Sequence, residues 1–389
     1  MEVFFATCPR GLEDLLGQEL QVLGGQAVRI VPGGVECQGS FPLCYRLNLE
    51  SRIASRILWR VGQGRYRHED DLYHLTFQMP WPDWFSVECR MKVRLVARQS
   101  PLTSVEFATL RVKDAVCDRF VQATRKRPTI DKRNPDIQVV VFVDEEQVVW
   151  YLDSSGDPLF KRGWRKEVGE APLRENLAAG ILRLAGWTGE QALLDPMCGA
   201  GTFLVEAALM AKGIPPGRGR QFAFRHFRWF DSSIWSALRN SSSDVTRSQA
   251  KLALFGVDQD AHALDRARRN LDFLGISGIS LNQGDALDVA PPRKTGLIVT
   301  NPPYGLRMGS RSELEQWYPK FGNLLKQQFA GWAVYILTAD FRLPKSMRLA
   351  PSRKIPLFNG SLESRLYEFK MVAGGNRKTA RLSQRQRDQ

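Results

Sequence analysis

The amino-acid sequence predicts an α/β fold in its second half and an α+β module in its first half. From about residue 160 onward, short apolar strands alternate with helical segments, a pattern typical of a parallel sheet with crossover helices. Before that point strands and helices follow in an irregular order, with paired strands at 137–143 and 147–152. A chain of 389 residues is also too long for one ordinary core, so we expect two or three domains.

The first half opens with a strand at 3–7 and a helix from Leu12 to Leu23, whose leucines recur at helical spacing. Further on, the patterns predict a helix-like apolar run from 44 to 59, a strand at 87–96 and a helix at 107–120. A basic loop with prolines follows that helix and holds Arg125, Lys126, Arg127, Lys132 and Arg133. Such a loop suits phosphate contact, and a solvated surface loop is an equal alternative.

The second half contains seven candidate strands, enough to complete a doubly wound sheet. They lie at 192–195, 253–258, 279–283, 296–300, 331–337, 354–358 and 365–370. From residue 374 the chain is basic with almost no apolar residue, so we expect 374–389 to be a disordered arm.

The charge balance points to a polyanionic partner. Lysine and arginine number 55 against 41 acidic residues, a formal net charge of +14, which favours nucleic acid as the partner. A merely basic protein is the alternative, because charge alone does not identify a ligand.

The six cysteines are scattered and form no Cys-x-x-Cys pair, so reduced thiols and no metal are expected. The first fifteen residues include charged side chains, and no stretch reaches the roughly 18 apolar residues of a membrane span. We therefore expect a cytoplasmic protein without a membrane partner.

The first motif with chemical content is a glycine-bearing loop between a strand and a helix, running from Leu193 to Ala208. Asp195 ends the strand, and Gly199 and Gly201 allow the backbone to approach a ligand closely. The loop lacks the lysine of a phosphate-binding loop and the third glycine of a dinucleotide fingerprint. It predicts a cofactor loop, with a structural turn as the alternative.

Two acids at the ends of the next strands suit a nucleoside-bearing cofactor. Asp258 ends the second strand, where its carboxylate can accept both ribose hydroxyls, whereas Asp260 is expected to be the N-cap of the following helix. Asp285 follows the third strand and could accept from an adenine amino group, although alone it is a weak signal. The alternative for Asp258 is an ordinary turn residue.

The fourth motif is Asn301, Pro302, Pro303 and Tyr304, directly after the strand at 296–300. The two prolines fix the backbone, so that the Asn301 side-chain oxygen and the Pro302 carbonyl can act as paired acceptors beside the Tyr304 ring. This arrangement fits a flat, amino-bearing base whose nitrogen receives a methyl group. A proline turn is the alternative for the tetrapeptide taken alone.

The ordered set of these motifs resembles the class I, Rossmann-like amino methyltransferases, whose cofactor is S-adenosylmethionine. Upstream, the segments 161–165 and 171–179 and the opening 6–16 resemble the THUMP-domain RNA guanine-N2 methyltransferases. The resemblance implies a ferredoxin-like region at 1–55, a THUMP RNA-binding domain at 56–160 and a seven-stranded methyltransferase domain at 161–373. One departure is Ala200, where the family often has serine.

The resemblance also implies the site residues. The catalytic set is the tetrapeptide at 301–304, and no metal is involved. The cofactor-binding set is Leu173, Arg174, Asp195, Met197, Cys198, Gly199, Gly201, Thr202, Asp258, Gln259, Asp285 and Ala286, in which Arg174 has an ordinary helix-start cation as its alternative.

The segment 216–235 is also similar to that family, and it interleaves arginines with aromatic residues. Arg218 and Arg220 join the basic loop as candidate RNA-binding residues. The aromatic side chains, among them Phe222, Phe224 and Trp229, could form a base-stacking surface or pack as an insertion, and packing is favoured.

The expected activity is transfer of a methyl group from S-adenosylmethionine to guanine N2 in RNA. Large-subunit ribosomal RNA is the favoured substrate. Guanine N2 in tRNA and adenine N6 in DNA are alternatives, because the tetrapeptide fits several planar amines. A non-catalytic RNA-binding factor of ribosome assembly is an alternative of a different class.

Overall fold

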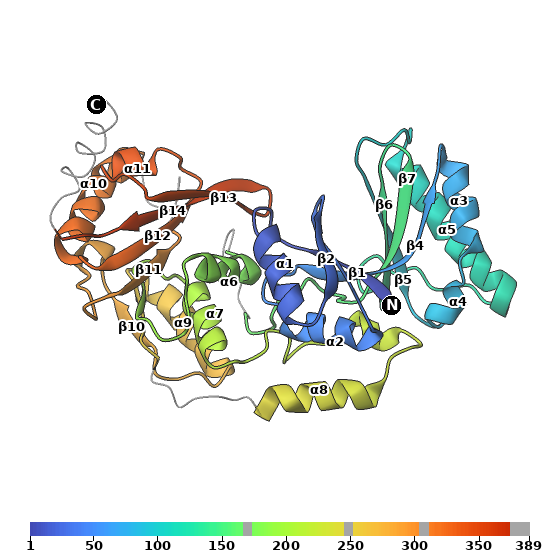
Figure 1. Cartoon of the computed structure of the whole chain (residues 1–389), viewed down its shortest axis with the longest axis horizontal. Helices are drawn as coiled ribbons and strands as arrows, with labels where there is room; N and C mark the ends of the chain where they lie inside the picture. The colour runs from blue at the N-terminus through green and yellow to red at the C-terminus, as the bar shows by residue number, and fades with distance from the viewer. Residues whose placement is uncertain (166–172, 245–251, 303–310, 374–389) are drawn as a thin grey trace. The chain divides into compact units, whose positions relative to one another are not determined.

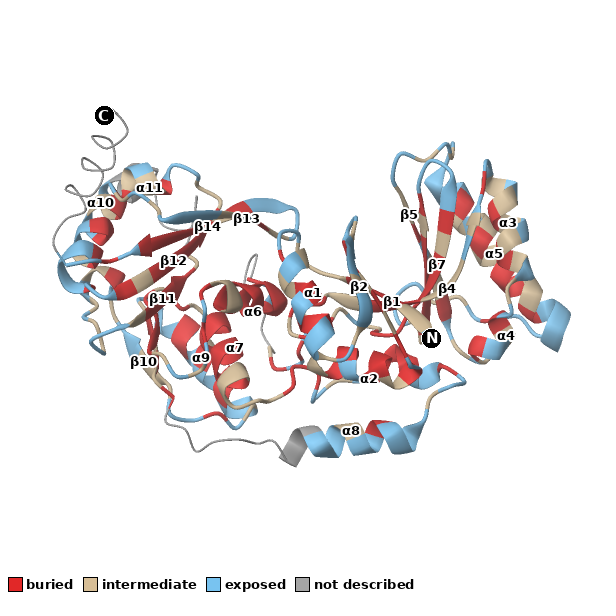
Figure 2. Ribbon diagram, viewed as in Figure 1, coloured by how far each residue is buried: buried red, intermediate tan, exposed pale blue. Residues whose placement is uncertain are grey.

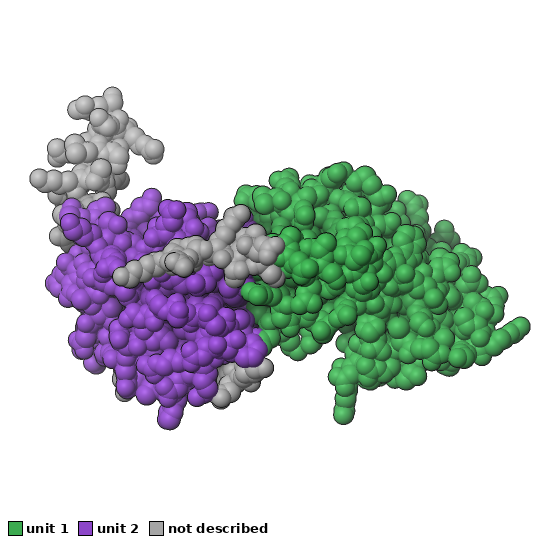
Figure 3. Space-filling view, turned by 90° about the horizontal axis from the view of Figure 1, so that it is seen from below, with its two compact units in different colours: residues 1–8, 12–163, 215–245 green, residues 9–11, 164–214, 246–389 purple. Residues whose placement is uncertain are grey.

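The computed structural model describes residues 1–165, 173–244, 252–302 and 311–373 (Figure 1). The predicted Pro303 and Tyr304 and the predicted basic arm lie outside these ranges. The described chain divides into two compact units, coloured separately in Figure 3: unit 1 is 1–8, 12–163 and 215–245, and unit 2 is 9–11, 164–214 and 246–389.

Unit 1 is built on a sheet in the order β2-β3-β1-β4-β7-β6-β5. Its strands are β1 (Glu2–Thr7), β2 (Gln26–Val31), β3 (Gly34–Gly39), β4 (Arg56–Arg65), β5 (Met91–Ala97), β6 (Ile137–Val143) and β7 (Gln147–Asp153). Its helices are α1 (Glu13–Val22), α2 (Phe41–Glu50), α3 (Glu69–Gln78), α4 (Trp81–Trp84), α5 (Val105–Thr124), η1 (Ala223–His226) and α8 (Ser232–Asp244).

Strand β4 joins the two halves of this sheet, because its first residues pair with β1 and most of its length pairs with β7. The register of the ladder to β7 shifts between Arg60 and Gly62. Such a bulge bends a strand locally, here near the middle of β4. The expected boundary at residue 55 therefore falls at the start of a strand that both halves share.

The helix predicted for 44–59 is wrong in its second part. Helix α2 ends at Glu50, and β4 begins at Arg56. Ile57, Leu58 and Trp59 are all buried in β4. A short, continuously apolar run has no period that separates a buried strand from a helix, which explains the error.

Residues 215–245 belong to unit 1, although they lie within the expected methyltransferase domain at 161–373. Phe222, Phe224 and Trp235 are buried, and Phe224 and Trp235 both pack against Tyr45 of α2. The favoured packing role is thus confirmed for Phe222 and Phe224, whereas Trp229 is 55% exposed. Apart from Trp235, the residues of α8 up to Ser241 are mostly exposed (Figure 2).

Unit 2 is built on a sheet in the order β10-β9-β8-β11-β12-β14-β13, and its seven strands confirm the seven expected from the sequence. They are β8 (Leu193–Asp195), β9 (Leu254–Asp258), β10 (Ser280–Gln283), β11 (Gly296–Thr300), β12 (Trp332–Thr338), β13 (Arg353–Asn359) and β14 (Leu362–Lys370). The helices are α6 (Glu175–Leu184), α7 (Thr202–Ala211), α9 (Ala261–Phe273), η2 (Ala286–Asp288), α10 (Arg311–Gln328) and α11 (Leu343–Ser346).

The strands from β10 to β12 are parallel, and β14 runs antiparallel between β12 and β13. Buried residues of β11, β12 and α10, such as Ile298, Trp332 and Phe321, form the core on one face of this sheet. No helix in the described part of the chain is long and apolar enough to cross a membrane.

Candidate functional site

The sheet of unit 2 brings the predicted cofactor motifs to one edge. Asp195 is the last residue of β8 and pairs with Gly256 of β9, two residues before Asp258 ends that strand. On the other side, Leu193 and Leu194 of β8 pair with β11, which leads to Asn301. Because the carboxyl ends of adjacent parallel strands meet at the same edge, the loops after β8, β9 and β11 lie next to one another.

The glycine loop after β8 requires its glycines. Gly199 has φ 54° and Gly201 has φ 77°, and Gly201 precedes the first residue of α7. A Cβ on Gly201 would also lie 3.1 Å from the Cβ of Ala267 in α9. Both positions thus have a left-handed backbone that favours glycine, and Gly201 is closely packed as well.

Two side chains from β9 and α9 hold this loop in place. The Asp258 carboxylate accepts from the Gly199 amide at 2.7 Å and, through its other oxygen, from the Asp260 amide at 2.9 Å. Asn270 of α9 donates to the Ala200 carbonyl at 3.2 Å. No sequence motif predicts this role of Asn270, whose one signal is a polar residue on the otherwise apolar face of a helix.

Asp260 caps α9, as expected, by accepting from the His262 amide at 2.9 Å. Asp285 has a similar contact, because it accepts from the Leu287 amide at 2.8 Å at the start of η2. This bond uses one oxygen of an exposed carboxylate and leaves the other for a ligand. The adjacent Ala286 is buried, and the Gln259 carbonyl accepts from Gln283.

Asp195 is the most buried acid at this edge, with 2% of its surface exposed. Burial raises the pKa of its carboxyl to about 7, against the lowering effect of the hydrogen bond from the Met197 amide. The Met197 amide lies 3.3 Å from its Oδ1. Asp195 is therefore partly protonated near neutral pH. The neighbouring Cys198 is also buried, and burial raises the pKa of its thiol.

Arg165 ties the chain before α6 to the start of α7. Its guanidinium donates to the Thr202 hydroxyl at 2.8 Å and to the Leu173 carbonyl at 3.1 Å, and it lies 2.9 Å from the Glu175 carboxylate. Leu173 is buried, whereas Arg174 is exposed where α6 begins. The segment 161–165 marked this region, but the sequence did not single out Arg165.

Asn301 follows β11 directly, as predicted. Within the part of the chain that the structure describes, its Oδ1 atom is buried and accepts no hydrogen bond. Pro302, beside it, is buried. A buried acceptor without a donor is costly in a folded protein, so this oxygen is a natural contact for a ligand amine.

The candidate RNA-binding residues are exposed to different degrees, and only some of them form ion pairs. Arg125, Lys132, Arg133 and Arg218 are exposed. Lys126 and Arg127 are exposed too, but Lys126 pairs with Glu88 at 2.9 Å, and Arg127 pairs with Asp114 at 3.4 Å. Residues that keep an unpaired charge at the surface are the better candidates for phosphate contact.

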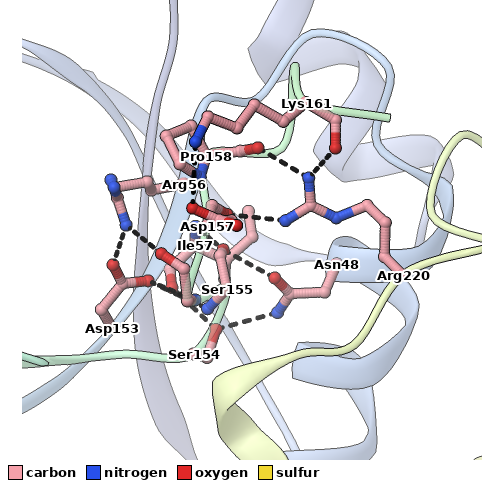
Figure 4. Close-up of polar contacts among 11 residues, drawn as sticks. Asn48, Arg56, Ile57, Asp153, Ser154, Ser155, Asp157, Pro158, Lys161 and Arg220 are labelled. Atoms are coloured by element: carbon pink, nitrogen blue, oxygen red, sulfur yellow. Dashed lines mark hydrogen bonds and ion pairs between the residues drawn. The ribbon is translucent and has the colours of Figure 1, made fainter. Parts of the chain in front are cut away.

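Arg220 has a structural role that the sequence did not predict. Its guanidinium donates to the backbone carbonyls of Pro158 at 2.6 Å and Asp157 at 2.7 Å, and also to that of Lys161 (Figure 4). Burial lowers its pKa to about 10. These bonds fix the turn at 157–161, so Arg220 is an anchor within unit 1 rather than a free cation.

All six cysteines are free, and no cluster of metal-ligating side chains occurs among the described residues. The strand order of unit 2, with its glycine loop after β8, is that of a methyltransferase fold.

The chain matches three domain families in order: the RlmL ferredoxin-like domain at 3–58, the THUMP domain at 66–153 and the RMKL-like methyltransferase domain at 162–368. The last match covers more than half of the chain. The protein therefore belongs to the RMKL-like methyltransferase family.

Curated relatives that match nearly the whole of this chain are named as methyltransferases as well. The chain is 39% identical over 376 residues to the ribosomal RNA large subunit methyltransferase K/L of Methylococcus capsulatus, covering 94% of this chain and 51% of that protein. It is 36% identical over 383 residues to the protein of that name from Shewanella baltica, covering 96% of this chain and 54% of that protein. The chain thus spans about half the length of these curated relatives.

Among solved structures, SMU.472 complexed with SAH matches with a TM-score of 0.87 and 27% sequence identity. The match covers 96% of this chain and 99% of that one, so both units have counterparts there.

Proposed function

We propose that the protein transfers a methyl group from S-adenosylmethionine to the exocyclic N2 of a guanine in 23S ribosomal RNA, in the cytoplasm. The names of the relatives support ribosomal RNA as the substrate class, and the THUMP domain supports RNA capture. The net charge of +14 is consistent with a polyanionic partner.

The residues at the sheet edge suit the proposed cofactor. Each Asp258 oxygen accepts one backbone amide and keeps a further acceptor site, so the carboxylate can also bind ribose hydroxyls. The free oxygen of Asp285 can accept from an adenine amino group. Bound S-adenosylmethionine supplies an electrophilic methyl group on a sulfonium. The likeness to a structure complexed with SAH supports the same assignment.

The observation that carries the proposal is the buried Oδ1 of Asn301, which accepts no hydrogen bond from the residues that the structure describes. An exocyclic amine on a heterocycle is a poor nucleophile, because its lone pair is delocalised into the ring. An acceptor that binds one of its hydrogens favours the geometry in which the lone pair points at the methyl carbon. Asn301 and the Pro302 carbonyl would serve as these acceptors, while Tyr304, outside the described residues, would stack on the base.

This chemistry constrains the RNA. The N2 amino group of a guanine inside a helix is engaged in pairing and cannot reach a buried acceptor at the edge of a sheet. We therefore expect the target guanine to be unpaired or flipped out of its stack. Arg174 is exposed at the start of α6, next to Leu173, and we propose that it contacts the cofactor.

The test is mass spectrometry of nucleosides from a strain that lacks the gene. The proposal expects N2-methylguanosine to fall in large-subunit rRNA and to return when the wild-type gene is restored. Loss from tRNA alone would move the activity to tRNA, and loss of N6-methyladenine from DNA would contradict an RNA substrate. Loss from no pool would reject the proposal.

Calorimetry with S-adenosylmethionine separates an enzyme from a non-catalytic assembly factor. The intact glycine loop and Asp258 predict binding. Absence of binding by folded protein would favour the assembly factor.

A further inference from the structure

Within unit 1, three segments that are distant in the sequence lie along one another. Residues 82–91 contact both the basic loop 125–133 and the stretch 225–229, which lies within the match to the methyltransferase domain at 162–368. In the basic loop, Ile130 forms a bridge with Met91, and Lys126 pairs with Glu88. We call these three segments together the composite strip.

The stretch 225–229 contacts 82–91 as well, because Phe227 forms an antiparallel bridge with Phe85. The Arg228 amide donates to the Trp84 carbonyl at 2.9 Å, and its Nε donates to the Pro82 carbonyl at 2.7 Å. These backbone and side-chain contacts hold 225–229 against 82–91, so the two segments form one continuous surface.

Trp229 is the exposed aromatic residue of the composite strip, with 55% of its surface accessible. Its indole N–H donates to the Asp83 carbonyl at 3.3 Å, and its own carbonyl accepts from the Tyr45 hydroxyl at 3.3 Å. A large aromatic ring held by its edge but open to solvent loses little conformational entropy when a flat ligand stacks on it. A single exposed apolar residue is common on protein surfaces. Trp229 differs in that hydrogen bonds hold its indole N–H and its backbone carbonyl in place.

The charge of the composite strip is positive. Its exposed cations without an ion pair among the described residues are Arg125, Lys132, Arg133, Arg225 and Arg228. Of the acids in the three segments, Glu88 pairs with Lys126 and Asp131 with Arg90, which leaves Asp83 as the one exposed carboxylate without an ion pair. An exposed aromatic ring on the same surface as several unpaired cations is the combination that binds single-stranded nucleic acid.

We propose that the composite strip binds a single-stranded segment of the RNA substrate, with one base stacked on Trp229 and phosphates on the cations of 125–133 and 225–228. This inference rests on the proposed function for the identity of the RNA. It adds that residues encoded within the catalytic half complete the RNA surface of unit 1. An unpaired segment is required because only an unstacked base offers its face to a side chain.

The test measures binding of a fluorescein-labelled single-stranded RNA of about 20 nucleotides to the full chain by anisotropy. Trp229→Ala should weaken binding by about 5- to 100-fold, and Trp229→Phe should restore most of the loss, since stacking on an aromatic face carries the effect. Phe107→Ala is the matched control, because Phe107 is 51% exposed in the same unit at the opposite end of α5 from the basic loop. It should change binding by less than about twofold.

Salt dependence gives an independent readout. Arg228→Gln and Arg133→Gln should each lower the slope of log affinity against log salt by about 0.7, as expected for one lost phosphate contact to a single strand. Unchanged RNA affinity in Trp229→Ala, or tighter binding of a duplex of the same length, would overturn the proposal. Wild-type protein that binds the probe through Trp229 but methylates no RNA would support the composite strip and reject the proposed function.

Discussion

The carboxylate of Asp258 accepts a hydrogen bond from the backbone amide of Gly199 at 2.7 Å. The acid that ends β9 therefore supports the loop that follows β8, in addition to the contact proposed with the cofactor. One side chain thus links the two motifs that the sequence identified separately. Its removal should affect both the shape of the loop and the affinity for the nucleoside.

Asp258→Ala should weaken the binding of S-adenosylhomocysteine by about 10- to 100-fold, the range expected when hydrogen bonds to a charged group are lost. Calorimetry measures this directly. Asp265→Ala is the control, because Asp265 is an exposed acid on the helix that follows, paired with Arg268. If both variants bound with wild-type affinity, Asp258 would have no part in the cofactor site.

Trp235→Ala tests the finding that residues 215–245 belong to unit 1. Trp235 is 5% exposed and packs against Tyr45, Phe222 and Phe224. Loss of this side chain should destabilise unit 1 by about 3–5 kcal/mol through the cavity that it leaves. The free energy of unfolding, followed by denaturant titration, reports the change.

The control for that variant is Ile234→Ala, which removes an adjacent side chain that is 40% exposed. It should change the free energy of unfolding by no more than about 0.5 kcal/mol. Equal effects of the two substitutions would show that the aromatic packing does not stabilise unit 1.

Much of the fold was predictable because its elements are strongly patterned. The seven strands of unit 2 are short apolar runs between helical segments, and all seven occur. The shared strand β4 was missed because Ile57, Leu58 and Trp59 are buried together and show no alternation. The membership of 215–245 in unit 1 is a tertiary fact, set by contacts between Tyr45 and residues far along the chain.

The candidate site was predictable where backbone geometry restricts residue type. Gly199 and Gly201 have positive φ, which favours glycine, and Asp260 caps a helix, a position that favours aspartate. Both features can therefore be recognised from residue type alone. Arg165 and Asn270 leave only weak signals, because the contacts that define their roles are to partners elsewhere in the chain. Arg220 was expected on RNA for its charge, but its guanidinium binds chain carbonyls instead.

The pH dependence of stability should report Asp195. Its pKa is about 7 in the folded protein against a reference value of 3.8, so the folded state retains a proton that the unfolded state has released. This contribution to stability is complete below the unfolded pKa and is lost as the pH rises to about 7, with a slope of at most about 1.4 kcal/mol per pH unit. Asp195→Asn should remove that slope between pH 4 and 7.

Denaturant titrations of both proteins across this range give the comparison. The difference in free energy of unfolding between wild type and Asp195→Asn should change with pH in that window and be constant above it. A difference independent of pH would mean that Asp195 is ionised in the folded protein throughout.

Asn301→Ala gives the most direct test of the account, because it removes an acceptor that the proposal assigns to the target amine alone. The measurement is a single-turnover reaction of purified protein with deuterium-labelled S-adenosylmethionine and unmodified 23S rRNA, read by mass spectrometry of the nucleosides. We expect labelled N2-methylguanosine with wild type and at least about 100-fold slower transfer with Asn301→Ala, at unchanged affinity for S-adenosylhomocysteine. Wild-type rates in the variant, or label on a base other than guanine, would contradict the account.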